Sequence, residues 1–278
     1  MKASRHHIVR KESAMTNNIT VELPIQPKDI FRLLALRSIT ETNMLLDRLS
    51  DKFDDISNGI KMTARLANRT SPFNYDHQPK NIDKDKPAKM TERELCASTR
   101  GFFNPNREFE YIGNVLDYEM PLDDTKNSAF GKVDLVAQIS NELLLLEVKK
   151  CVSYEHPLRA MFEIFTFWKM LKDTNGANGG FGKFITAYTT SNAYKSRGEK
   201  LRLPKPELVT PGLLLCNSSK NGSICKELLE NRTEYDKLYK RFLDEPIAMR
   251  IFVYDEDTLD IDEKTDNLKV QLGIPPNN

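Results

Sequence analysis

Two apolar runs rich in β-forming residues lie in the middle of the chain, and a short polar pair separates them. The runs are Val133–Ile139 and Leu143–Val148, and the pair is Ser140-Asn141. Short apolar runs bounded by turn residues are typical of β-strands, and two small polar residues between such runs predict a tight turn. The middle of the chain therefore predicts a β-hairpin.

The register of this hairpin determines which side chains share a face. If Ile139 pairs with Glu142, then Asp134 lies opposite Glu147. Side chains alternate between the faces of a strand, so Lys149 shares a face with Glu147. The intervening apolar residues are expected on the other face: Val133, Leu135, Leu144, Leu146 and Val148. This register brings two carboxylates and an ammonium together.

Such a group has a chemical use. Neighbouring carboxylates repel each other unless a cation lies between them, and hard oxygen ligands suit Mg²⁺. A bound Mg²⁺ lowers the pKa of a water and offsets charge on a phosphoryl oxygen, and Lys149 can orient that water or stabilise the charge. The alternative is a solvated edge hairpin, in which Asp134 and Glu147 pair with nearby lysines. The placement about the turn and the apolar second face favour the metal site.

Helices are predicted on both sides of the hairpin. Thr91 and Glu94 fit a capping box, in which Glu94 is either the cap or a third acidic ligand. A later helix begins at His156-Pro157, because proline suits the first helical position, and runs to about Lys172. Its three–four apolar stripe predicts core packing: Met161, Ile164, Phe165, Trp168 and Leu171.

Arg159 and Glu163 share another face of this later helix. They either pair with neighbouring charges or look across the metal site. Further strands are expected at Phe109–Met120 and Phe184–Thr190, and a basic segment interleaved with tyrosines follows the second of them. That segment suits a nucleic-acid strand, through phosphate pairing and base stacking, or is a solvated loop: Lys195, Arg197, Lys200, Arg202 and Lys205.

The C-terminal part predicts a strand, a helix and a strand. These are Pro211–Cys216, Ile224–Leu243 and Ala248–Tyr254, and the acidic Asp255–Asp266 after them is expected to be a mobile tail. The polar linker at 69–89, which holds three prolines, separates residues 1–68 from a domain at 90–278.

Residues 1–68 predict a basic arm and then a long helix or a helical hairpin. The helix carries an apolar seam of about two heptads, too short to establish a coiled coil. Packing against the chain's own body is favoured, and homodimerisation is the alternative. The seam residues are Leu46, Leu49, Phe53, Ile56 and Ile60.

Composition limits the classes of function. A net charge of +1 over 278 residues excludes a globally basic nucleic-acid binder, so any binding surface must be a local patch. The four cysteines form no CxxC pair, which argues against structural zinc and against a disulfide framework. No apolar run reaches about 18 residues, so we expect no membrane partner and a cytoplasmic protein.

From Thr91 to Thr190 the predicted order is helix, three strands, helix and strand. With Asp134, Glu147 and Lys149 on the second and third strands, this resembles the PD-(D/E)XK nuclease superfamily. The resemblance implies an α/β fold with a mixed central sheet flanked by helices. It implies a restriction-endonuclease-like αβββαβ core, here with an N-terminal helical segment. No proline precedes Asp134, which departs from the motif.

The resemblance also implies a site. Mg²⁺, with Mn²⁺ as a substitute, would be held by Asp134, Glu147 and the carbonyl of Val148, and Lys149 would be the catalytic lysine. The acidic residue of the preceding helix would be Glu94 or, as second choice, Glu92. Glu163 would lie on the following helix, although Glu163–Phe167 only partly fits the Gln-x-x-x-Tyr motif of one branch.

The expected function is metal-dependent hydrolysis of phosphodiester bonds, with DNA favoured over RNA. The resemblance implies that cleavage leaves a 5′-phosphate. Residues expected to contact the nucleic acid are Lys150, Arg159, Glu163, Lys195 and Arg197. The alternatives are a nucleic-acid-binding module with a vestigial site and an assembly protein that uses the N-terminal seam.

Overall fold

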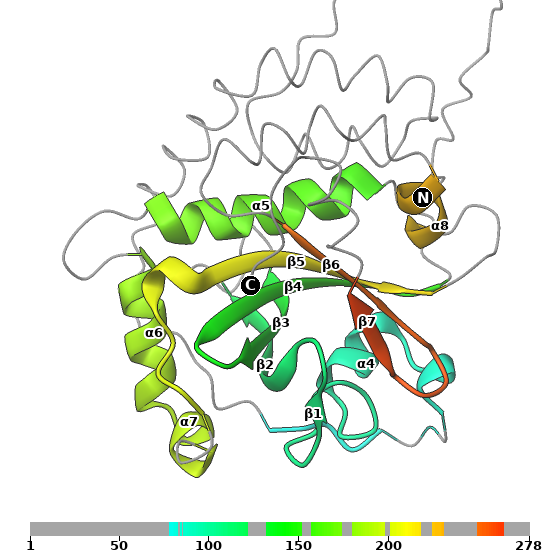
Figure 1. Ribbon diagram of the computed structural model, residues 1–278. Coiled ribbons are helices and arrows are strands. Elements are labelled where there is room, and N and C mark those ends of the chain that lie inside the picture. Colours follow the sequence, from blue (N-terminus) through cyan, green and yellow to red (C-terminus); the bar gives the residue numbers. More distant parts are fainter. Residues whose placement is uncertain are drawn as a thin grey trace, which may run out of the picture.

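The computed structural model describes residues 78–82, 84, 86–121, 132–151, 157–173, 180–197, 201–217, 224–230 and 249–263 (Figure 1). The expected N-terminal arm, long helix and apolar seam lie outside these residues, as does much of the linker. The domain boundary and the homodimer therefore stay predictions.

A mixed sheet forms the centre of the described structure, which confirms the expected α/β class. Its seven strands follow the order of the chain. Neighbours are antiparallel from β1 to β4, parallel from β4 to β6, and antiparallel again at β7. The strands are β1 (Glu108–Phe109), β2 (Gly113–Pro121), β3 (Lys132–Ile139), β4 (Glu142–Lys149), β5 (Val209–Cys216), β6 (Arg250–Tyr254) and β7 (Ile261–Glu263).

Helices lie on both faces of this sheet. In Figure 1, α5 runs along one face, while α4 lies on the opposite side and α6 and α7 stand at one end. Within the described residues, no helix is both long and apolar enough to cross a membrane. The helices are α4 (Glu92–Ala97), α5 (Pro157–Asp173), α6 (Gly180–Thr190), α7 (Asn192–Arg197) and α8 (Ile224–Glu230), with short 3-10 turns at Pro87–Lys89 and Pro206–Leu208.

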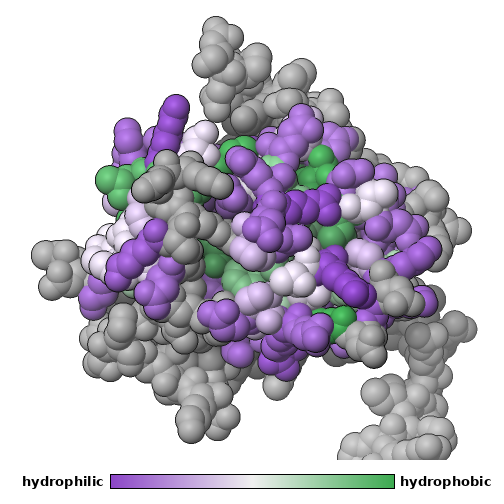
Figure 2. Space-filling model, turned by 90° about the horizontal axis from the view of Figure 1, so that it is seen from below, coloured by the Kyte–Doolittle hydropathy of each residue, from purple (hydrophilic) through white to green (hydrophobic). Residues whose placement is uncertain are grey.

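Each face of the sheet buries a separate apolar core. The α5-side core contains Trp168, whose indole N–H donates to the Val209 carbonyl at 2.7 Å. The α4-side core contains Leu95, Phe102 and Tyr254. Figure 2 views the molecule from below; among the residues that it colours, most are hydrophilic, and the hydrophobic ones form small separate areas. Strand β4 lies between the two cores, which explains its run of consecutive leucines.

The expected hairpin and its register are confirmed. Pairs run from Ile139↔Glu142 to Leu135↔Leu146. Ser140 takes a left-handed φ of 54°, a conformation that tight hairpin turns require. The helix expected at Pro157 is also confirmed, since α5 begins there.

The expected face of Val133 is wrong. Val133 packs in the α5-side core, whereas Leu135 packs in the α4-side core. The neighbouring strand explains the change, because Glu119 has a left-handed φ of 47°. On either side of it, Tyr118 faces the α4-side core and Met120 the α5-side core, and Val133 pairs with Met120.

The strand expected at Phe184–Thr190 is a helix, α6. Its apolar residues recur three and four apart and form a stripe that packs on the α5-side core: Phe181, Phe184, Ile185 and Tyr188. The threonines are accommodated because their hydroxyls bond to the preceding turn; Thr190 Oγ1 donates to the Thr186 carbonyl at 3.0 Å. Part of the expected basic loop is likewise the helix α7.

Two further expectations, both about strands at the edges of the sheet, are wrong. The strand expected at Phe109–Met120 is interrupted by a turn before Gly113, whose φ is 68°. The expected mobile tail contributes the edge strand β7. It is held by Arg250, whose guanidinium pairs with Glu263 at 2.8 Å.

A disulfide joins Cys151 to Cys216, contrary to the expectation from cysteine spacing. The two cysteines are 65 positions apart in sequence. They meet because β4 and β5 are parallel neighbours whose carboxyl ends coincide. Spacing along the chain does not reveal such a pair.

Candidate functional site

Asp134 lies where β3 separates from β4. The backbone N–H of Val148 donates to Asp134 Oδ2 at 2.9 Å. A strand residue directs its N–H and its C=O toward the same neighbouring strand. The Val148 carbonyl therefore faces the side on which Asp134 lies.

Glu147 and Lys149 form a buried ion pair on β4. Their side chains are 4% and 6% exposed, and Lys149 Nζ lies 2.7 Å from Glu147 Oε1. Being two residues apart on one strand, they project from the same face, as the sequence pattern predicts. The structure thus brings Asp134, Glu147 and Lys149 to one end of the hairpin.

Helix α4 adds a third carboxylate, and it is that of Glu92. Glu92 Oε1 lies 3.6 Å from Lys149 Nζ, and Glu92 Oε2 accepts a hydrogen bond from the backbone N–H of Lys150 at 3.3 Å. Sequence reasoning favoured Glu94 for this place. The structure puts Glu94 elsewhere.

Glu94 completes the capping box at the start of α4. Its carboxylate accepts from the Thr91 N–H at 2.7 Å and pairs with Lys84. These partners hold the pKa of Glu94 at about 2, mainly through the bond from Lys84. Residues two apart on a helix do not share a face, so the side chains of Glu92 and Glu94 contact different residues.

Burial and mutual repulsion set the electrostatics of the site. Burial raises the pKa of Asp134 to about 7, against the Lys149 charge and the Val148 hydrogen bond that lower it. The pKa of Glu147 is raised well above its usual value, first by burial and then by Asp134. Negative charge on Glu163 of α5 raises both pKa values further. The cluster therefore carries more carboxylate than its single ammonium, that of Lys149, can balance.

The residues expected to bind nucleic acid are dispersed. Arg159 and Glu163 are half-buried on α5, and Glu163 is close enough to influence the carboxylates. Lys150 is buried, and its ammonium bonds to the Met90 and Ala88 carbonyls at 2.5 and 3.0 Å. Its contacts are therefore with the chain itself.

Lys195 and Arg197 lie on α7, at the other end of the sheet (Figure 1). The segment after them contacts the hairpin turn, where the Lys205 N–H donates to the Asn141 carbonyl at 3.2 Å. From Ile139 to Asp134 the strand spans about 17 Å. Lys195 is exposed there, but it does not join the carboxylate cluster.

Tyr254 adjoins the site and was not singled out in the sequence. Its buried hydroxyl donates to the Lys149 carbonyl at 3.4 Å. No local motif marks it, because β6 reaches β4 only through β5.

The site thus consists of Asp134, the Glu147–Lys149 pair, Glu92 and the backbone of Val148, with Glu163 nearby. It combines hard oxygen donors with one ammonium in a largely buried setting. Comparisons of the chain with protein-family models, curated proteins and solved structures find no match.

Proposed function

We propose that the protein is a metal-dependent nuclease that hydrolyses phosphodiester bonds, with DNA preferred over RNA. The observation that carries the proposal is the meeting of Asp134 with the buried Glu147–Lys149 pair at the end of the β3–β4 hairpin. Along the chain, α4 is followed by the strands β1 to β4, then by the helices α5, α6 and α7, and then by β5. With β5 in place of the strand expected at Phe184–Thr190, this order supports the restriction-endonuclease-like αβββαβ core that the sequence resembles.

The donor set fits Mg²⁺, with Mn²⁺ as a substitute. Asp134, Glu147 and the Val148 carbonyl offer hard oxygens on one side of β4, and Mg²⁺ is commonly bound by one or two carboxylates. The raised pKa values of both carboxyl groups record the cost of their charge without a cation. A divalent cation there would favour the ionised forms of both.

When bound, Mg²⁺ would supply an acidified water and stabilise charge on a phosphoryl oxygen. The chain's own residues do the positioning. Glu147 holds the Lys149 ammonium at 2.7 Å, so that this donor is fixed in place. Glu92, at 3.6 Å, limits its movement from the α4 side. Lys149 can then hydrogen-bond to the attacking water or to the phosphate as negative charge develops.

A nucleic-acid substrate requires cations near the site. With a net charge of +1, the chain binds a polyanion through local cations. Two such cations are Arg159, which lies on α5 with Glu163, and the exposed Lys195, which lies on α7 at the far end of the hairpin. We place the scissile phosphate at Lys149, and we assign Lys195 and Arg197 to contacts with the sugar–phosphate backbone of the nucleic acid beyond the scissile phosphate.

Cleavage of labelled DNA and RNA tests the proposal. Single- and double-stranded DNA and RNA are incubated with Mg²⁺, Mn²⁺ or EDTA, using wild type, Asp134→Asn and Glu147→Gln. Both variants should lose cleavage by about 100-fold or more. Glu94→Gln, on the same helix as Glu92 but outside the cluster, is the matched control and should cleave normally.

Cleavage that persists in both carboxylate variants would overturn the site assignment. No cleavage of any substrate, together with salt-sensitive binding, would identify the protein as a binding module instead.

A further inference from the structure

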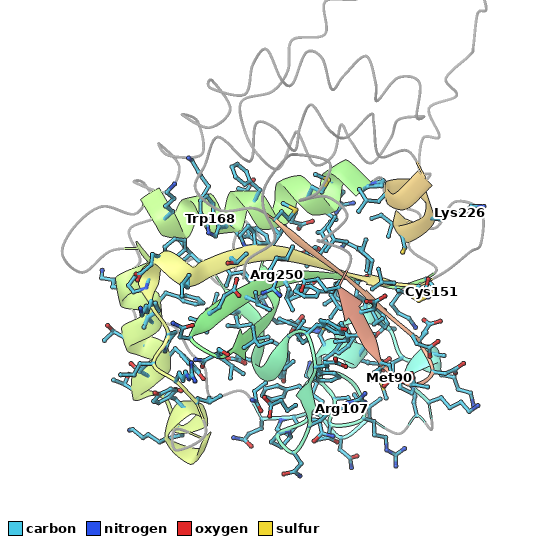
Figure 3. The ribbon with its side chains drawn as sticks, in the orientation of Figure 1. Met90, Arg107, Cys151, Trp168, Lys226 and Arg250 are labelled. Carbon is cyan, nitrogen blue, oxygen red and sulfur yellow. A yellow bond between two sulfur atoms is a disulfide. The ribbon has the colours of Figure 1, made fainter. Side chains whose placement is uncertain are left out.

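The Cys151–Cys216 disulfide lies at the edge of the candidate site. Paired residues of β4 and β5 run to Lys149↔Leu215, so Cys151 follows two positions after the last of them. Beyond Lys149, the described backbone leaves the β4–β5 ladder. The disulfide fastens this end of β4 to the end of β5, and Figure 3 labels Cys151 at that end of the sheet.

Several chain segments converge on the disulfide. A carboxylate oxygen of Glu256, which follows β6, lies within 4.8 Å of both sulfur atoms. Glu256 pairs with Lys150 at 2.9 Å, and Lys150 in turn donates to the Met90 carbonyl just before α4. The ends of β4, β5 and β6 are thus joined to the start of α4.

This junction fixes the geometry of the site. The N–H of Lys150, next to Cys151, donates to Glu92 at 3.3 Å. Glu92 lies 3.6 Å from the Lys149 ammonium, and Tyr254 bonds to the Lys149 carbonyl. A shift of the β4 end therefore changes how Glu92 and Lys149 face each other.

We propose that the Cys151–Cys216 disulfide is a redox-controlled crosslink that holds the residues of the candidate site in their active arrangement. This inference rests on the proposed function. A dithiol reductant attacks the half-buried Cys151 rather than the buried Cys216. The sulfur–sulfur bond breaks, two electrons and two protons pass to the cysteines, two thiols form, and the reductant becomes a disulfide. The opened β4 end lets Lys149 and Glu92 move apart, and cleavage falls.

The test compares oxidised protein with protein reduced by dithiothreitol under anaerobic conditions. Thiol labelling after denaturation verifies the states, because among the described cysteines only Cys96 and Cys225 carry thiols when the bond is closed. Reduction should lower the cleavage rate and raise the Mn²⁺ dissociation constant, each by about tenfold. It should also speed amide exchange at Lys149 and Lys150.

Variants separate the disulfide from other effects of the reductant. Cys151→Ser and Cys216→Ser should behave like the reduced wild type and ignore dithiothreitol. Cys225→Ala, on α8, should retain the full response of wild type to dithiothreitol.

The outcomes distinguish this inference from the proposed function. Equal cleavage by verified oxidised and reduced protein would overturn the inference while leaving the nuclease intact. If neither state cleaves, weaker Mn²⁺ binding and faster exchange after reduction would still support the inference. Stoichiometric uptake of Zn²⁺ by the reduced protein would overturn it, and would make Cys151, Cys216 and Glu256 a metal site.

Discussion

At the scale of single residues, the surroundings of the site disfavour the ionised form of its carboxyl groups. Asp134 and Glu147 are partly or fully removed from water and repel each other, and Lys149 compensates only in part. Such destabilising arrangements are found where function requires them. Their consequences are measurable without any substrate.

The pKa of Asp134 predicts how stability depends on pH. In the folded protein the Asp134 carboxyl holds its proton up to about pH 7, whereas the ordinary pKa of an aspartate carboxyl is 3.8. Between these values the folded state binds more protons, so its stability should fall as pH rises. In EDTA at pH 8, Asp134→Asn should raise the free energy of unfolding by about 1–2 kcal/mol. Urea titrations from pH 4 to pH 8 measure this, and an unchanged pH profile would contradict it.

Mg²⁺ should reverse that penalty. A cation that binds only the folded state stabilises it by mass action, by about 3 kcal/mol when its concentration is about 100 times its dissociation constant. Thermal unfolding with Mg²⁺ and with EDTA measures the effect. Glu147→Gln should show a much smaller response, and an equal response would indicate that the cation binds elsewhere.

Glu92 and Glu94 give a matched pair on one helix. Glu92→Gln removes a charge 3.6 Å from the Lys149 ammonium and should lower cleavage by about tenfold. Glu94→Gln should leave cleavage within about twofold, because Glu94 bonds to Thr91 and Lys84 instead. The reverse ranking would restore Glu94 as the acidic residue of the site.

At the scale of elements, the two apolar runs and the polar pair between them were sufficient to predict the hairpin and its register from Ile139↔Glu142 to Leu135↔Leu146. The same reasoning failed for α6, where a β-branched composition concealed a three–four stripe. It also failed for Val133, because the left-handed Glu119 on another strand changes which face Val133 joins. The choice between Glu92 and Glu94 depends on how α4 is rotated against the sheet, which local spacing does not reveal.

Two glycines test the elements that sequence reasoning misread. Gly113, between β1 and β2, has a φ of 68°, and an added Cβ would lie 2.1 Å from the Gln138 carbonyl oxygen. Gly113→Ala should therefore cost about 2–4 kcal/mol of stability. Gly182 on α6 has open space around it, so Gly182→Ala should stabilise the helix by about 0.5–1 kcal/mol. Urea unfolding measures both, and a loss of stability in Gly182→Ala would contradict the helix.

At the scale of the whole molecule, the disulfide could not be predicted because its cysteines are 65 positions apart and meet only through the parallel pairing of β4 and β5. Closing a loop of this length is expected to contribute about 4 kcal/mol to stability. Reduction should lower the free energy of unfolding by about that amount, measured by urea titration with and without dithiothreitol. Cys151→Ser should show no further loss on reduction.

The position of β4 between two cores has a consequence for motion. Glu147 and Lys149 are mounted on a strand that is covered on both faces, so their backbone should exchange its amide hydrogens slowly. Glu92, in contrast, comes from a helix of six residues. A short helix can open locally while the strand stays closed. Glu147 and Lys149 are therefore held in place by β4, whereas Glu92 can move away when α4 opens. Native-state hydrogen exchange should show α4 opening at a lower free energy than β4.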